Sequence, residues 1–307
     1  MFCYNVFGTS IVSEIDIPFL IPQVAAEEQQ KVVISYSKMC DYEYSYVTFL
    51  GMKYNGEIRA YDTEYKTLVM YENHISLLIT KDGTEIKIIC EEKDISEALL
   101  YCFTSGITIN LYYRGYFVLH AAAFENNKKI YGFVGDSGVG KTTLLLSMLN
   151  EGVKIYSDDI TAINLNGAVP NGDLPYKLWQ DSLFLLDGFE YESTPLMPGI
   201  EKKWIKLKKD LSSTKILPVD CLFILKPYKD NQNSKIMIEK LDTIQIVEEL
   251  VSNLHAFWCL PNDIKQTQVK FLNYIMSSSR VVYLRYPKKM EMIKQLTEYI
   301  LNYINKT

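Results

Sequence analysis

The chain has 307 residues, of which 48% are hydrophobic and 22% charged, and its formal net charge is −5. This length is enough for one large or two ordinary domains, each with its own core. The acidic balance argues against a broad electrostatic surface for nucleic acid.

The sequence indicates neither a membrane span nor a disulfide framework. No apolar run approaches the length of about 18 residues that crosses a bilayer, and the opening MFCYNVFGTS lacks the basic start of a signal peptide. The six cysteines form no C-x-x-C pair, and most lie in apolar runs such as VDCLFIL. Such cysteines are typical of a reduced core. We expect a cytoplasmic protein with no membrane and no nucleic-acid partner.

Residues 1–110 are rich in short runs of strand-forming residues. Tyr, Val, Ile and Thr are frequent in KVVISYS, EIRAYDT, YKTLVMYE and HISLLITKDGTEIKIICEE, and the Asp-Gly pair in the last run is typical of a hairpin turn. The segment DISEALLYCFTSGITINLYYRG then begins with an Asp cap and continues at helical spacing. We predict a mainly β module over residues 1–110, linked to the rest by one or two helices.

Residues 111–307 favour an α/β domain. The runs YFVLHAAAF and KIYGFVG flank an ENNKK turn, and they precede a helical run, KTTLLLSMLNEG, and a buried strand, VKIYS. This strand, loop, helix, strand order predicts a parallel pairing between the two strands that flank the helix.

Later elements are predicted from the same patterns. We expect a loop over NGAVPNGDLP, a helix over YKLWQDSLFLLDGF, and a loop that leads into a basic strand over PLMPGIEKKWIKLKKD. Strands are predicted over PVDCLFILKPY and RVVYLRYP, and helices over DTIQIVEELVSNLHAFW, NDIKQTQVKFLNYIMSSS and MEMIKQLTEYILNYI.

The stretch GDSGVGKTT matches the G-x-x-x-x-G-K-T pattern of a phosphate-binding loop between a strand and a helix. Glycines let such a loop turn its N–H groups, and the positive end of the following helix, toward a polyphosphate. Lys141 would then bridge the outer phosphates, and the Thr142 hydroxyl would bind Mg²⁺. We predict that the nucleotide is bound by Gly135, Asp136, Ser137, Gly138, Val139, Gly140, Lys141, Thr142 and Thr143. A glycine-rich turn that merely precedes a lysine is the alternative.

Asp158 and Asp159 follow the strand after the loop helix. Parallel strands of a right-handed βαβ unit end at the same edge of a sheet, so both carboxylates should emerge near the loop. One of them can bind Mg²⁺ while the other accepts the proton of an attacking hydroxyl. The alternative is that Asp159 only terminates the strand.

His120 ends the run YFVLH, and it is one of three histidines in the chain. His74 and His255 lie in segments where the sequence indicates no partner for them. A lone histidine at a strand end is more often structural than catalytic.

Taken together, LHAAAF, GFVGDSGVGKTTLL and KIYSDDI resemble the catalytic half of HPr kinase/phosphorylase and its relatives, which share a P-loop fold with ATP-dependent phosphoenolpyruvate carboxykinase. The resemblance implies a P-loop kinase core of this type at residues 111–307, preceded by the β module. It implies that Lys141 contacts the transferred phosphate and that Thr142 binds Mg²⁺. It also implies that Asp159 is the proton acceptor with His120 beside it, which leaves Asp158 as the metal ligand.

The remainder is similar to smaller HPr-kinase-like proteins of bacteria, in NVFGTSIVSEIDIPFL, KLWQDSLFLL and PGIEKKW. Lys202 or Lys203 stands where the bifunctional enzyme has its catalytic Arg, and such a cation would stabilise charge on the phosphoryl group. The metal-binding Glu of that enzyme has no counterpart except, as a guess, Asp181. A basic pair is otherwise typical of solvated surface or of a β edge that discourages strand addition.

These features predict an ATP- and Mg²⁺-dependent kinase that transfers the γ-phosphoryl group to a hydroxyl of a peptide, a protein or a small molecule. The alternative is a regulatory protein that binds ATP or GTP without phosphotransfer. The Asp pair and His120 count against it, because binding alone requires neither. A carboxykinase would need more arginines for its dicarboxylate substrate than this chain supplies. The resemblance also suggests a homo-oligomer.

Overall fold

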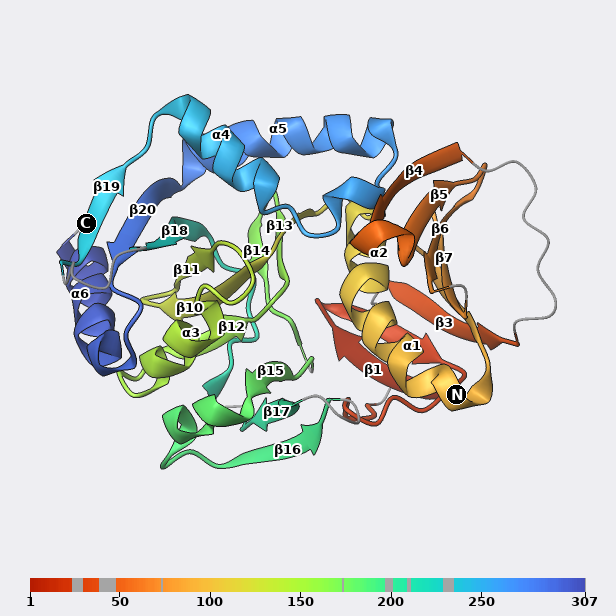
Figure 1. Ribbon diagram of the computed structural model, residues 1–307, viewed down its shortest axis with the longest axis horizontal. Helices are drawn as coiled ribbons and strands as arrows, with labels where there is room; N and C mark the ends of the chain where they lie inside the picture. Colours follow the sequence, from red (N-terminus) through yellow and green to blue (C-terminus); the bar gives the residue numbers. More distant parts are fainter. Residues whose placement is uncertain are drawn as a thin grey trace. The chain divides into compact units, whose positions relative to one another are not determined.

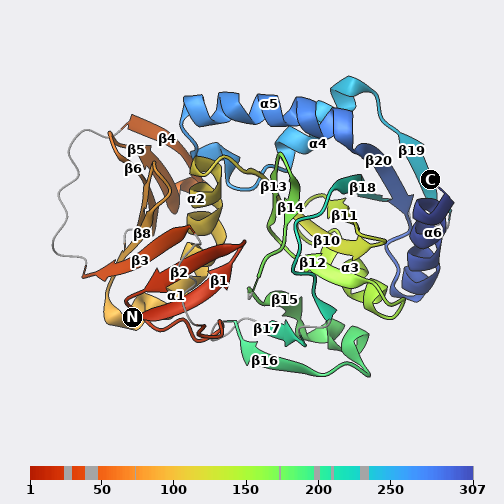
Figure 2. The same cartoon turned by 180° about the vertical axis from the view of Figure 1, so that it is seen from behind.

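The computed structural model describes residues 1–23, 30–38, 48–72, 74–172, 174–196, 201–208, 211–228 and 235–306 (Figures 1 and 2). It is a mixed α/β protein whose strands form several sheets. Two compact units are present: Met1–Val118, Asn171–Leu174 and Leu254–Phe271 form the first, and Leu119–Pro170, Pro175–Asn253 and Leu272–Thr307 the second. No helix in the described ranges is long and apolar enough to cross a membrane.

The first unit contains an eight-stranded sheet in the order β1-β2-β3-β8-β7-β6-β5-β4. The bounds are β1 (Phe2–Val6), β2 (Thr9–Ser13), β3 (Lys31–Ser37), β4 (Thr48–Lys53), β5 (Ile58–Asp62), β6 (Lys66–Tyr71), β7 (Ile75–Thr80) and β8 (Glu85–Cys90). β3 is parallel to both neighbours, and the other pairs are antiparallel. The predicted strands are confirmed here, and the Asp-Gly turn joins β7 to β8.

The helical segment after β8 packs on this sheet. It consists of α1 (Ile95–Tyr101), a π-helical stretch (Cys102–Gly106) and α2 (Ile107–Tyr113). A side chain at Gly106 would place its Cβ 3.3 Å from Leu77 of β7, so glycine permits the close approach. The helix is confirmed, but the predicted cap is wrong, because the Asp94 side chain forms no capping hydrogen bond.

The second unit contains a six-stranded sheet in the order β12-β10-β11-β18-β20-β19. The bounds are β10 (Ala121–Asn126), β11 (Lys129–Val134), β12 (Lys154–Ser157), β18 (Val219–Pro227), β19 (Met237–Lys240) and β20 (Arg280–Tyr286). The predicted pairing of β12 with β11 is wrong, since β10 lies between them. Both are antiparallel to β10 and therefore run in the same direction. The parallel neighbour of β11 is β18, which is itself parallel to β20.

The helices of the second unit are α3 (Lys141–Leu149), α4 (Thr243–Ser252) and α6 (Ile293–Lys306). α3 and α6 share one apolar core with the sheet, which includes Phe133, Phe223 and Ile300. β9 (Phe117–Leu119) leads into this unit, and α5 (Asn262–Ser278) begins in the first unit and ends here. The helices predicted at these four positions are confirmed, except that the helix before HAFW ends at Ser252 and this stretch enters a 3-10 turn, Phe257–Cys259.

A three-stranded antiparallel sheet of β15 (Tyr176–Trp179), β17 (Lys202–Leu207) and β16 (Tyr191–Pro195) completes this unit, with a hairpin of β13 (Thr161–Asn164) and β14 (Gly167–Val169). The predicted helix over YKLWQDSLFLLDGF is wrong. Its start is β15, in which burial alternates with the period of a strand, and a 3-10 segment, Gln180–Leu186, follows. The predicted NGAVPNGDLP loop includes β14. The predicted basic strand is confirmed as β17, whereas residues 197–200 of its loop lie outside the described residues.

Gly167 of β14 gives a direct test of this packing. Its φ is +128°, and a Cβ there would lie 2.2 Å from the carbonyl oxygen of Leu217. Gly167→Ala is therefore expected to lower the free energy of unfolding by roughly 2–6 kcal/mol, from backbone strain plus overpacking. Gly188→Ala is the matched control, because φ is +88° there and no described atom lies within 4 Å of the added Cβ. Urea unfolding of both variants measures the difference, and equal losses would contradict the close contact.

Candidate functional site

The loop between β11 and α3 depends on three glycines. Gly135, Gly138 and Gly140 have φ angles of +152°, +76° and +108°, a region that side chains other than glycine rarely occupy. Gly140 directly precedes the first turn of α3. The loop therefore brings the N-terminus of α3, with its unpaired N–H groups and positive dipole end, to the carboxyl end of β11.

Lys141, at the first position of α3, folds back onto this loop. Its ammonium group donates to the carbonyl oxygens of Gly135 at 2.6 Å and Asp136 at 3.0 Å. The residue is only 7% exposed, and burial lowers its pKa against the opposing charges of Asp159 and Asp158. A buried ammonium group thus lies at the head of a helix, where an anion can replace carbonyl oxygens as its partner.

Two side chains from the end of β20 brace the same loop. The hydroxyl of Tyr286 donates to the carbonyl of Val139 at 2.7 Å, and the ammonium group of Lys288 donates to the carbonyl of Gly138 at 2.7 Å. Burial raises the pKa of Tyr286, so this hydroxyl stays protonated and can donate. No local sequence motif indicated these residues, because the contacts join segments far apart in the chain.

Thr142 and Asp158, the two residues predicted to bind Mg²⁺, contact each other. The Thr142 hydroxyl donates to Asp158 Oδ1 at 2.9 Å. Burial, and then the charge of Asp159, raise the pKa of Asp158 to about 6, while the Thr142 hydrogen bond, Lys177 and Lys141 oppose the rise. A hydroxyl and a carboxylate are hard oxygen donors of the kind that Mg²⁺ takes from proteins, so these residues fit that ion.

Asp159 occupies an unusual backbone position. Its φ is +68°, and the N–H of Ile160 donates to the carbonyl of Asp158 at 2.8 Å, which closes a three-residue turn with Asp159 at its centre. Such turns are rare and strained for residues other than glycine. Ser157 and Thr161 hold the base of the turn, with their hydroxyl oxygens 2.7 Å apart. Local strain of this kind occurs disproportionately at functional sites.

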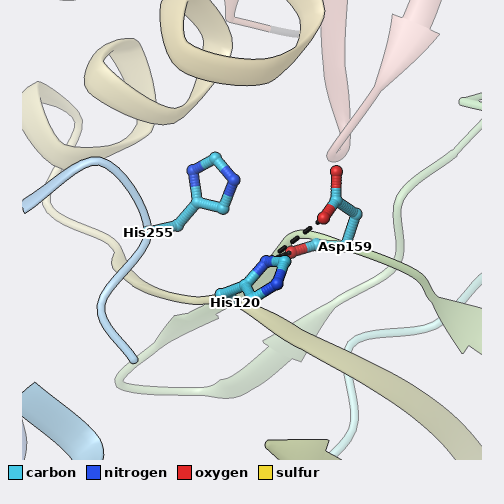
Figure 3. A group of neighbouring side chains, drawn as sticks. All are labelled: His120, Asp159 and His255. Carbon is cyan, nitrogen blue, oxygen red and sulfur yellow. Dashed lines mark hydrogen bonds and ion pairs between the residues drawn. The ribbon is translucent and has the colours of Figure 1, made fainter. Parts of the chain in front are cut away.

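His120 lies against Asp159, as Figure 3 shows. Its Nδ1 is 3.1 Å from Asp159 Oδ1 and 3.2 Å from the Asp159 carbonyl oxygen. Both of these oxygen atoms are hydrogen-bond acceptors, so Nδ1 must carry the proton. His255, also drawn there, belongs to the first unit, where its Nδ1 is 3.1 Å from Thr108 Oγ1. The sequence indicated no partner for His255, and the structure gives it Thr108.

His74 also has partners. Its Nδ1 lies 3.3 Å from the carbonyl oxygen of Glu72, and its Nε2 lies 3.8 Å from a carboxylate oxygen of Glu97. All three residues belong to the first unit. The structure therefore gives His74 a local, structural set of contacts.

A basic side chain that the sequence did not indicate holds the other oxygen of Asp159. Lys177 of β15 places its Nζ 2.9 Å from Asp159 Oδ2 and over the ring of Trp204, 5.3 Å from the ring centroid. Lys177 was not recognised as a site residue because this segment was predicted to be a helix. In the structure, buried Tyr176 and Leu178 alternate with less buried Lys177 and Trp179, but four residues are too few for the sequence alone to distinguish a strand from a helix.

These groups line one cavity of about 210 Å³. Its walls come from the loop and α3, from the turn after β12, and from β15, the following 3-10 segment and β17. The lining residues are His120, Ser137, Gly138, Gly140, Lys141, Thr142, Thr143, Asp158, Asp159, Lys177, Leu178, Trp179, Ser182 and Lys202. Of the predicted loop residues, Gly135, Asp136 and Val139 are outside this lining.

The two lysines of β17 that the sequence offered as alternatives, Lys202 and Lys203, differ in their position relative to the cavity. Lys202 lines the cavity, with its Nζ over the ring of Trp179, 4.7 Å from the ring centroid. Lys203 does not line the cavity, since neighbouring residues of a strand point to opposite faces. Asp181 is exposed and is also outside the lining. Among these candidates, the structure therefore brings only Lys202 to the loop and the aspartates.

Asp158→Asn tests the buried carboxylate. An unfolded Asp has a pKa of about 3.9, so raising it to about 6 costs roughly 3 kcal/mol above pH 6 and nothing below pH 4. Without divalent metal, the variant is expected to be more stable than the wild type at pH 8 by up to that amount, with no gain at pH 4, in urea unfolding. Asp220→Asn is the control of opposite sign, because the bonds to Lys129 and Arg280 outweigh burial and lower the pKa of Asp220. A pH-independent gain in Asp158→Asn would contradict the assignment.

Comparison with known proteins identifies no family for this chain. No family model matches the sequence, and no curated protein matches it. Among solved structures, the HPr(Ser) kinase/phosphatase from Coxiella burnetii aligns over 62% of this chain and 97% of its own, with 13% sequence identity and a TM-score of 0.31. A likeness this low does not establish a shared fold, so the functional argument rests on the site.

Proposed function

We propose that the protein is an ATP- and Mg²⁺-dependent kinase whose acceptor is a hydroxyl group. One observation carries the proposal: a single cavity combines the head of α3, with Lys141 and Thr142, and the Asp159 carboxylate that two basic side chains hold. Binding of a polyphosphate alone requires the first half of this cavity. A fixed carboxylate in the same cavity supplies what a phosphotransfer needs in addition, a group that takes a proton.

The donor half binds the triphosphate. The ammonium group of Lys141 exchanges the carbonyl oxygens of Gly135 and Asp136 for the outer phosphates, and the N–H groups at the start of α3 add further donors. Thr142 and Asp158 hold Mg²⁺, which when bound neutralises phosphate charge. Lys202, which lines the same cavity, adds positive charge near the phosphoryl group.

The acceptor half handles the proton. The acceptor oxygen forms a bond to the γ-phosphorus as its proton passes to the Asp159 carboxylate, and the bond from the γ-phosphorus to the β,γ-bridging oxygen breaks. ADP leaves with that oxygen. His120 holds Asp159 in place through its Nδ1 proton, at 3.1 Å. The acceptor is a Ser or Thr of a peptide or protein, or a small hydroxyl compound.

The test is a transfer assay with γ-labelled ATP, Mg²⁺ and a panel of free hydroxy amino acids, HPr and serine-containing peptides. Label on an acceptor, with ADP formed in equal amount, supports the kinase. Tight binding of ATP without transfer to any acceptor or to water contradicts it, and favours a nucleotide-binding regulatory protein.

A further inference from the structure

Lys177 reaches Asp159 from an element that contributes nothing to the phosphate loop. It lies on β15, whereas His120 lies between β9 and β10 and Asp159 lies in the turn after β12. The two donors take different oxygens of one carboxylate: His120 Nδ1 is 3.1 Å from Oδ1, and Lys177 Nζ is 2.9 Å from Oδ2. A carboxylate bound at both oxygens cannot rotate about its side chain without breaking one of these contacts.

The Lys177 side chain is itself held in place. It is only 15% exposed, its ammonium group lies over the Trp204 ring, and Trp204 is its register partner on β17. Desolvating an ammonium group costs free energy unless it has charged or hydrogen-bonding partners. The pairing of β15 with β17 does not require an ion pair between Lys177 and Asp159. The position of this lysine on the cavity wall, against a strained aspartate, therefore points to a role in the site.

We propose that Lys177 is a positioning residue for the proposed phosphotransfer: it fixes the Asp159 carboxylate in the orientation that receives the acceptor proton. This inference rests on the proposed function. The rival role is a direct contact between Lys177 and the transferred phosphoryl group. The two roles differ in whether Lys177 acts through Asp159.

A double-mutant cycle separates them. Lys177→Met, Asp159→Asn and the double variant are compared with the wild type, using γ-labelled ATP, Mg²⁺ and a serine-containing peptide pool, with phosphate release to water measured in parallel. Lys177→Met is expected to lower kcat by about 10- to 100-fold, as misplacement of a reacting group does. The KM for ATP is expected to change less than twofold. In the Asp159→Asn background, the same substitution is expected to cause no further loss.

Two further variants complete the test. Lys177→Arg keeps the charge and is expected to recover part of the lost kcat. Lys81→Met removes a lysine of the first unit that lies 2.9 Å from Asp62 Oδ1, a contact of equal length outside the cavity, and is expected to leave kcat unchanged. Thermal unfolding of every variant confirms that it is folded.

The outcomes are distinct. Losses in kcat that multiply in the double variant overturn the positioning role and favour the direct contact, and so does a large rise in the KM for ATP. A Lys177→Met protein as active as the wild type overturns the role of Lys177 and leaves the kinase standing. A wild-type protein that transfers phosphate neither to an acceptor nor to water overturns the proposed function, and this inference with it.

Discussion

Asp159→Asn is expected to lower kcat by about 10²- to 10⁴-fold, the usual contribution of a proton acceptor. The amide keeps the size of the carboxylate, and its single oxygen can still accept from either Lys177 or His120, but it cannot take the proton of the acceptor hydroxyl. The affinity for ATP should change little, because the loop, α3 and Thr142 are untouched. Transfer from γ-labelled ATP measures the first quantity, and calorimetric titration with ATP measures the second.

Asp187→Asn is the control for this experiment. Asp187 is exposed in the same unit and lies outside the cavity lining, so transfer should be unaffected. A wild-type rate of transfer in Asp159→Asn would contradict the role of Asp159 as proton acceptor, on which the kinase proposal depends. A parallel loss of ATP affinity and rate would instead place Asp159 in nucleotide binding.

The elements that the sequence predicts best are those with a local signal. Strand-forming residues and the Asp-Gly turn indicated β7 and β8, and apolar spacing indicated α5 and α6. The pairing of strands is not local. A hairpin strand, β10, inserts between β11 and β12, and neither of those two segments carries a sequence signal that the strand preceding β11 lies between them. β15 was missed because four residues are too few to distinguish strand from helix by periodicity.

The same division applies to the site. The loop residues were predictable because they form one contiguous motif. The turn at Asp158 and Asp159 lies close to Thr142 because β12 and β11 run in the same direction. Lys177 is close to Asp159 only because β15 pairs with β17. Lys202 was distinguishable from Lys203 only once β17 showed which of the two faces the cavity. Contacts of this kind arise from tertiary packing, which a single sequence does not display.

Lys141→Met is expected to weaken ATP binding by about 10- to 150-fold, the equivalent of one charge-assisted hydrogen bond worth about 1.5–3 kcal/mol. Transfer should fall further, by about 10²- to 10³-fold, because the ammonium group also stabilises charge on the phosphates as they react. Met fills a similar volume and needs no partner. The folded protein without ATP should therefore stay close to wild-type stability, since the lost bonds to Gly135 and Asp136 are offset by the removal of a buried charge.

Thermal unfolding with and without ATP separates these effects. A ligand at 100 times its Kd stabilises a protein by about 2.7 kcal/mol, so at that ATP concentration the wild type should gain clearly in Tm and Lys141→Met should gain much less. Lys288→Met is the comparison, because Lys288 is exposed and donates to the carbonyl of Gly138 in the same loop but does not line the cavity. It should retain most of the ATP-dependent gain. Equal ATP-dependent gains in Tm in the wild type and in Lys141→Met would contradict this role. The ammonium group would then remain bonded to the loop carbonyls when nucleotide binds, and it would stabilise the loop without contacting phosphate.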